Sequence, residues 1–219
     1  MKDKDVFDEI SSIKNIMERS TRFISLSGLS GVMAGIYASV GAGLAYAVMP
    51  KYVELNLHPE NMSTVGLFYS NNNGHLTAIL LLIAIAVLIL SIGTGIWLTI
   101  RKARRKQQVV WSPSSRSLLK AGLLPLITGG IFILILLSKN HYGIIAPACL
   151  IFYGLALAAA SQYTYGDVKW LGLCEIALGL IAMLLPGYGL LFWALGFGVL
   201  HILYGTIMYF KYDRENSAH

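Results

Sequence analysis

Charged residues are scarce in this chain. They make up 13% of its 219 residues, whereas 56% of the residues are hydrophobic. Ordinary soluble domains carry roughly 25% charged residues. A soluble fold of this composition would have too few charged side chains to cover its surface, so the composition excludes most soluble classes and predicts a membrane protein.

Cysteine and recognisable catalytic motifs are also lacking. The two cysteines, Cys149 and Cys174, fall inside apolar stretches, where a thiol behaves as a small core residue. No zinc-type spacing, nucleotide loop, hydrolase elbow or metalloprotease helix occurs in a suitable context. We therefore expect no disulfide, no metal site, no cofactor and no enzymatic activity, although an intramembrane acid/base pair leaves catalysis open.

Long apolar runs, in contrast, are abundant. A membrane-spanning helix needs about 20 predominantly apolar residues, and six runs of that length can be marked. They lie at about 24–48, 76–100, 118–138, 142–162, 168–186 and 188–210. The predicted fold class is all-α, with six transmembrane helices arranged as three antiparallel helical hairpins within residues 23–212.

The basic residues predict the orientation, because lysine and arginine in short loops are retained on the cytoplasmic side. With the N-terminus inside, only Lys51 and Lys139 of the 17 basic residues lie outside. We therefore expect cytoplasmic N- and C-termini, a multi-pass protein of the bacterial inner membrane, and no cleaved signal peptide. This distribution also accounts for the net charge of +6 without a nucleic-acid partner.

The segments outside the spans carry further expectations. Residues 1–22 have apolar positions at helical spacing and balanced charges on the other face, which predicts a cytoplasmic amphipathic helix that docks on the bundle, a partner protein or the membrane surface. Residues 213–219 form a cytoplasmic tail. The role of the external segment 50–75 stays open, because its Glu54, His58, Glu60 and His75 show no metal-ligand spacing.

Small residues recur at helical spacing along the predicted spans, which favours close helix packing or self-association into a homo-oligomer. The turn at 186–189 joins the last two spans, and antiparallel pairing there would place Gly172 opposite Gly205 and Gly179 opposite Gly198. Similar spacings earlier in the chain predict three two-helix repeats. The expected packing glycines are Gly28, Gly31, Gly35, Gly122, Gly129, Gly172, Gly179, Gly198 and Gly205.

The last two spans carry the progression Gly172, Gly179, Pro186, Gly198 and Gly205. This pattern resembles the short two-helix repeats of the acid-resistance membrane protein family exemplified by HdeD, over about forty residues. The resemblance implies a six-span inner-membrane bundle with a non-catalytic role in acid or stress tolerance. The long segment 50–75 and the basic segment 101–117 depart from that family's pattern.

Glu175 is the most informative single residue, because a carboxylate in hydrocarbon costs several kcal/mol unless it is paired or neutral. The antiparallel register places His201 at the same depth, so the two side chains are expected to pair and to hold a proton between them. Tyr204 extends this polar group toward the cytoplasm, and depth alone adds Thr94 and Tyr153. The alternative interpretation is a structural Glu–His hydrogen bond that fixes helix register.

Two classes of function follow from these features. The first is a membrane protein that handles protons or a small solute, or senses stress, through the intramembrane Glu/His pair. The second is a non-transporting membrane anchor that recruits a cytoplasmic protein partner through the N-terminal helix and the basic loop. Membrane lipid is a partner in both.

Overall fold

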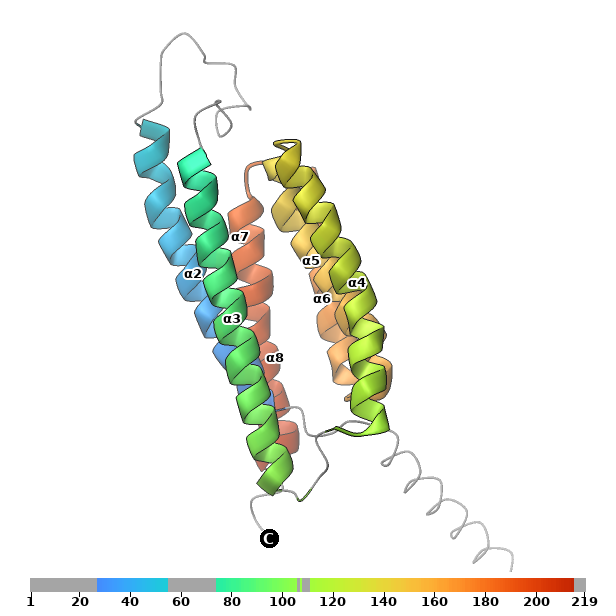
Figure 1. Ribbon diagram of the computed structural model, residues 1–219. Coiled ribbons are helices and arrows are strands. Elements are labelled where there is room, and N and C mark those ends of the chain that lie inside the picture. The colour runs from blue at the N-terminus through green and yellow to red at the C-terminus, as the bar shows by residue number, and fades with distance from the viewer. Residues whose placement is uncertain (1–26, 55–73, 106, 108–110, 215–219) are drawn as a thin grey trace, which may run out of the picture.

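The computed structural model describes residues 27–54, 74–105, 107 and 111–214, and this part of the chain is all-α (Figure 1). The helices are α2 (Gly28–Glu54), α3 (Gly74–Arg105), α4 (Pro113–Ser138), α5 (Ile145–Ala160), α6 (Asp167–Leu184) and a continuous C-terminal rod. This rod consists of α7 (Gly189–Trp193), the π-helix η4 (Ala194–Leu200), α8 (His201–Met208) and the π-helix η5 (Tyr209–Arg214). The predicted helix at 1–22, most of segment 50–75 and most of the tail lie outside the described residues.

The prediction of six long helices is confirmed, and five of them are long and apolar enough to cross a membrane. The exception is α6, which has 18 residues and carries Asp167, Lys169 and Glu175. In contrast, α3 is longer than the predicted span. Its last turn adds Lys102, Arg104 and Arg105, cations that the negative end of a helix dipole stabilises.

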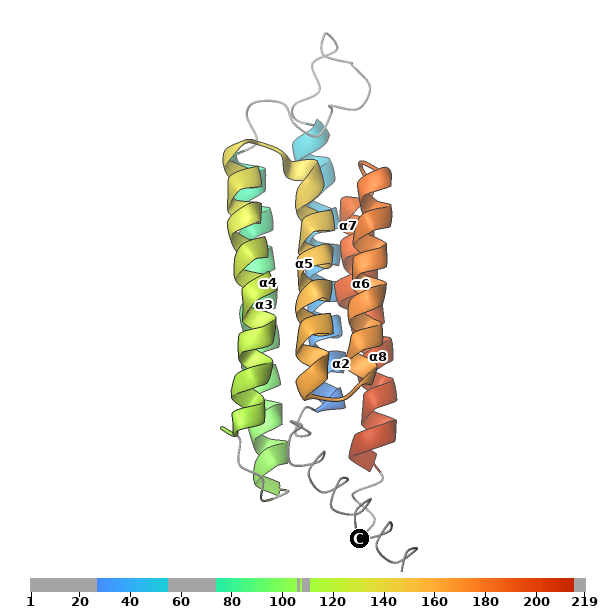
Figure 2. The same cartoon turned by 90° about the vertical axis from the view of Figure 1, so that its right-hand side faces the viewer.

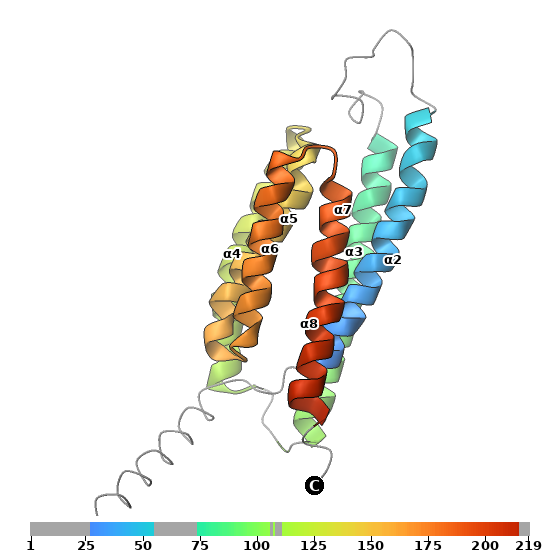
Figure 3. The same ribbon diagram turned by 180° about the vertical axis from the view of Figure 1, so that it is seen from behind.

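The helices form two layers of three. The first layer contains α2, α3 and the C-terminal rod, with α2 in the middle, and the second contains α4, α5 and α6, with α5 in the middle. Figures 1 and 3 show the layers edge-on, and in Figure 2 the second layer lies in front of the first. The chain passes between the layers after α3 and again after α6, where Gly187 takes a positive φ of 95° in the turn.

This arrangement corrects part of the hairpin prediction. The pairs α2–α3 and α4–α5 pack closely as expected, but α6 and the C-terminal rod belong to different layers. Each of these two elements packs mainly on the central helix of its own layer, α6 on α5 and the rod on α2. The third hairpin therefore connects the layers instead of forming a closely packed pair.

The glycine contacts follow from this packing. A Cβ atom at Gly172 would lie 2.7 Å from the carbonyl oxygen of Gly154 on α5, and one at Gly205 would lie 2.7 Å from that of Gly28 on α2. The predicted layers of Gly172 with Gly205 and of Gly179 with Gly198 are therefore wrong. The small faces of α6 and the rod are used instead for close backbone approach to α5 and α2, where van der Waals contact drives helix association in lipid.

The remaining expected packing glycines also lie at helix contacts. Gly31 approaches Gly205, Gly35 approaches Gly198, and Gly179 approaches Pro147 and Ile151. Gly129 makes room for the Phe152 ring, whereas Gly122 has only ordinary van der Waals contact with α5.

Candidate functional site

Glu175 lies in the middle of α6, and its side chain is fully buried. His201, the first residue of α8 in the other layer, is also buried. The Nδ1 atom of His201 lies 3.4 Å from Oε1 of Glu175. The pairing predicted from the sequence is therefore present, and it joins the two layers across their interface.

The imidazole ring of His201 is held from both sides. Its Nδ1 atom lies 3.0 Å from the carbonyl oxygen of Gly196, and its Nε2 atom lies 2.8 Å from the hydroxyl of Tyr153 on α5. A proton on Nδ1 donates to the Gly196 carbonyl, and in that tautomer the Tyr153 hydroxyl donates to Nε2. Tyr153 thus joins the site as predicted, and it adds a second contact between the layers.

Gly196 is a member of this site that the sequence did not reveal. A Cβ atom there would lie 2.5 Å from Oε2 of Glu175, so any larger residue would force the carboxyl group to move. Gly196 precedes His201 by five residues, a separation that an α-helix does not place on one face. The π-helical segment Ala194–Leu200 widens the turn and brings the Gly196 carbonyl to His201, and such π-bulges are frequent at functional sites.

Aromatic rings enclose the histidine. The Phe197 ring centroid lies 5.1 Å from that of Tyr153 and 5.9 Å from that of His201, and Trp193 follows at 5.3 Å from Phe197. Tyr153 and Phe197 place aromatic surface against the imidazole, and Trp193 packs behind Phe197. The pair is therefore placed in an environment of low polarity, where electrostatic interactions are strong.

The carboxyl group of Glu175 has few partners. Neither of its oxygens accepts a hydrogen bond from the described residues, and the ion-pair contact to His201 is the polar contact it makes among them. A buried carboxylate without donors is costly, so this group needs either its own proton or a protonated imidazole beside it. Both states of the pair are electrically neutral overall, and they differ in the position of one proton.

The surroundings of the Glu175–His201 pair differ toward the two ends of α6. Toward the Leu184 end of α6, buried Leu150, Ala182 and Phe192 form an apolar cluster, against which Leu178 and Phe197 pack. Toward the Asp167 end, polar groups follow instead. The Tyr204 hydroxyl, one turn beyond His201, is buried without a hydrogen-bond partner among the described residues, and the side chain interacts electrostatically with Asp167.

At the Asp167 end of α6, the side chains of Asp167, Lys211 and Tyr212 form a polar cluster, here called the clasp, that also joins the layers. Asp167 accepts hydrogen bonds of 2.7 Å from Lys211 and from the Tyr212 hydroxyl, both on η5. Hydrogen bonding to Lys211 lowers the pKa of Asp167 below its ordinary value. Tyr165 stacks on Tyr212 with ring centroids 4.0 Å apart, and burial raises the pKa of Tyr165 to about 12.

Thr94 is not brought to this site. Its hydroxyl donates to the carbonyl oxygens of Leu90, at 2.7 Å, and Ser91, at 3.3 Å, on its own helix. Because α3 packs on α2 and not on α5 or α6, equal depth in the membrane does not bring Thr94 near Glu175. Within the described residues, no group of three His, Cys, Asp or Glu side chains is arranged to hold a metal ion, and Cys149 and Cys174 are free.

Comparisons with protein-family models, curated proteins and solved structures find no match to this chain. The chemical argument for function therefore depends on the geometry of Glu175, His201, Tyr153 and Gly196.

Proposed function

We propose that the protein is a six-span protein of a bacterial inner membrane with both termini in the cytoplasm and no enzymatic activity. The distribution of basic residues supports this orientation. The charges on α6 do not oppose a sixth span, because Asp167 and Lys169 lie at its end and Glu175 is sheltered between the layers.

We infer that this bundle binds a proton at Glu175, His201 and Tyr153 and thereby senses the proton concentration on the cytoplasmic side. One observation carries this proposal: a fully buried carboxyl group whose polar contact among the described residues is an imidazole from the opposite layer. Release of this proton leaves a buried carboxylate beside a neutral imidazole, with a net charge of −1, and its uptake restores a neutral pair, so proton binding changes the interaction between the layers. Polar groups of this kind within membranes are usual in proton-handling proteins.

The two ends of the site favour a sensor over a conducting path. Tyr204 and the clasp of Asp167, Lys211 and Tyr212 offer polar groups on one side, whereas the cluster of Leu150, Ala182 and Phe192 has none on the other. Proton conduction requires polar groups or water in both directions. A proton that enters and leaves by the same side supports sensing.

The resemblance of the last two helices to HdeD-type repeats agrees with a role in acid or stress tolerance, which we propose as the physiological setting. The alternative of a recruiting anchor depends on residues 1–22, which lie outside the described residues, and on the basic loop, of which Arg101, Arg104 and Arg105 are described. Deleting that segment separates the two functions, because a proton site within the bundle does not need it.

Infrared difference spectroscopy between acidic and alkaline pH tests the proton site. We expect the carbonyl band of a buried protonated carboxyl group to change with pH, and the Glu175→Gln variant to lose that change. The Asp167→Asn variant should keep it, since Asp167 lies in the clasp and not in the pair. A spectrum without any carbonyl change that depends on Glu175 would rule out the proton site.

Spin labels test whether the proton is coupled to the layers. Labels at exposed Leu88 on α3 and Leu134 on α4, in a background without Cys149 and Cys174, report the separation between the layers. We expect acidification to change the distance distribution in the native pair and not in Glu175→Gln. Identical distance distributions at all pH values would show that proton binding does not change the separation of the layers, and would contradict the sensor proposal.

A further inference from the structure

The last two turns of α3 present two faces with different roles. Leu98 and Ala103 are buried on one face, and Lys102 beside them pairs with Asp213. The neighbouring exposed face carries Trp97, Arg101, Arg104 and Arg105, which lie within about 100° of the helix circumference. These four residues are exposed, and the Trp97 side chain remains 59% accessible.

Two of the tryptophans at this end of the bundle, Trp97 and Trp111, pair with an arginine. The guanidinium carbon of Arg101 lies 5.5 Å from the ring centroid of Trp97, and that of Arg116 lies 5.5 Å from the ring of Trp111. Ser112 and Ser115 form a capping box with Pro113 at the start of α4, which fixes the turn that presents Trp111 and Arg116. Tryptophan is enriched where the hydrocarbon core meets the lipid headgroups.

The acids near these arginines are engaged elsewhere. Among the described residues, the acids at this end are Asp167, paired with Lys211, and Asp213, paired with Lys102. Arg101, Arg104, Arg105 and Arg116 therefore make no ion pair with the described residues. All four arginine side chains are exposed.

We propose that Trp97, Arg101, Arg104 and Arg105 form a binding site for the phosphate of an anionic phospholipid headgroup. The charge needed for membrane orientation could be supplied equally by lysine. Arginine, however, presents a planar fork that binds a phosphate through two parallel hydrogen bonds, and it stacks on tryptophan at the same time. The inference requires that the bundle spans the membrane, and it is independent of the Glu175 site.

Quenching of Trp97 by brominated lipids tests the site. The full chain is placed in nanodiscs that contain brominated phosphatidylglycerol or brominated phosphatidylcholine at equal mole fraction, and the Trp97 signal is taken as the difference from Trp97→Phe. We expect phosphatidylglycerol to be preferred roughly fivefold or more, since each basic residue near an anionic surface contributes about 1 kcal/mol. Equal quenching by the two lipids would overturn the proposal.

A triple variant separates the arginine fork from bulk charge. Arg101→Lys, Arg104→Lys and Arg105→Lys together keep the charge and hence the membrane orientation, but we expect them to lose most of the phosphatidylglycerol preference. A preference unchanged from the native chain would mean a general attraction to charge and would overturn the site. Lys139→Gln, at the other end of α4, should leave the preference intact, and so should Glu175→Gln.

Excess inorganic phosphate serves as the second control. A lipid headgroup is held at the membrane surface beside Trp97, so we expect free phosphate not to abolish the preference. Complete displacement by phosphate would point to a site for a soluble anion and would overturn the lipid assignment.

Discussion

Glu175 and His201 approach within 3.4 Å although they belong to different layers of the bundle. Other polar contacts between the layers also occur among the described residues. The Tyr153–His201 hydrogen bond lies beside the pair, and the Asp167 clasp lies at the end of the same two elements. The polar contacts between α6 and the rod therefore follow one line, which runs from the middle of the bundle to one end.

Removing one partner of the pair should be more costly than removing both. His201→Phe leaves the Glu175 carboxyl group without its polar contact, and breaking a buried pair in this way costs about 3–5 kcal/mol. The double variant Glu175→Gln, His201→Phe should recover part of that loss, because no charge is then stranded. Reversible unfolding in mixed micelles measures the cycle, with Thr94→Val as a control outside the site. Additive losses would show that the two side chains do not interact.

Gly196 provides a steric test of the same site. In Gly196→Ala the new Cβ would lie 2.5 Å from Oε2 of Glu175 and would also meet Leu150, so the carboxyl group must move. We expect a loss of about 1–3 kcal/mol from overpacking, together with an altered infrared carbonyl band. Gly95→Ala is the matched control, because a Cβ there meets no atom within 4 Å. Equal stability of the two variants would contradict the tight packing around Glu175.

The sequence predicted the Glu175–His201 pair because only two quantities determined it. A helix has a fixed rise per residue, and the short turn at 186–189 fixes the antiparallel register, so equal depth could be calculated. The packing partners of the glycines could not be calculated in the same way. The small faces of α6 and the rod fit α5 and α2 as well as they fit each other, and nothing local distinguishes these partners.

The sequence did not place Gly196, Thr94 and Asp213 correctly, and the reasons are physical. Gly196 reaches the site through a π-helical turn, which shifts the helical phase by one residue, and no residue pattern marked that turn. Depth alone placed Thr94 near the site, but rotation about the helix axis and the choice of layer depend on long-range packing. Asp213 was assigned to a tail, yet it lies in a network that joins three helices.

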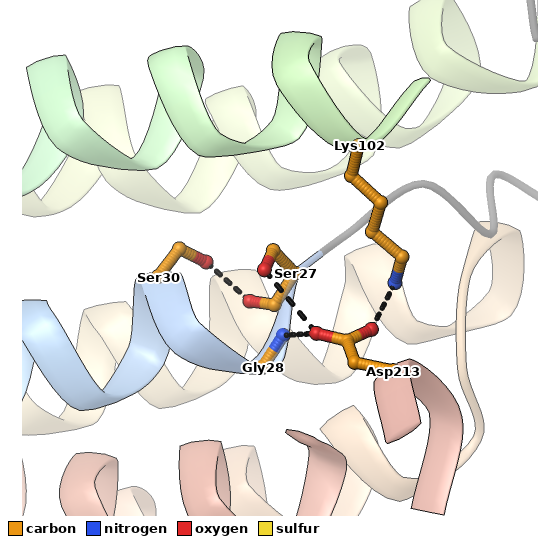
Figure 4. A network of polar contacts seen from close by, with 5 residues as sticks. All are labelled: Ser27, Gly28, Ser30, Lys102 and Asp213. Carbon is orange, nitrogen blue, oxygen red and sulfur yellow. Dashed lines mark hydrogen bonds and ion pairs between the residues drawn. The ribbon is translucent and has the colours of Figure 1, made fainter. Parts of the chain in front are cut away.

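That network makes a prediction for helix α2. One oxygen of Asp213 accepts hydrogen bonds from the Gly28 N–H, at 3.0 Å, and the Ser27 hydroxyl, at 3.3 Å, and the other pairs with Lys102 at 2.6 Å (Figure 4). Asp213→Ala should cost about 1 kcal/mol through the lost cap and speed hydrogen exchange in the first turn of α2. Lys102→Met keeps the cap and should change exchange there less. Equal protection in both variants would exclude the cap.

The Asp167 clasp predicts a dependence on pH. Hydrogen bonding to Lys211 lowers the pKa of Asp167 in the folded protein, so this group contributes stability above its unfolded pKa of about 3.9. That contribution is lost as the pH falls through the lower, folded pKa, because the protonated acid no longer pairs with Lys211. The pair is partly exposed, so we expect the loss to be small.

Carboxyl carbon shifts of Asp167 measure the titration directly by nuclear magnetic resonance. Lys211→Met should move the midpoint upward, toward the unfolded value, while Lys169→Met, another exposed lysine at this end, should move it less. A midpoint that stays in place in Lys211→Met would show that the clasp does not hold the carboxylate. The Asp167 carboxylate would then contribute nothing to joining α6 and the rod even above its unfolded pKa.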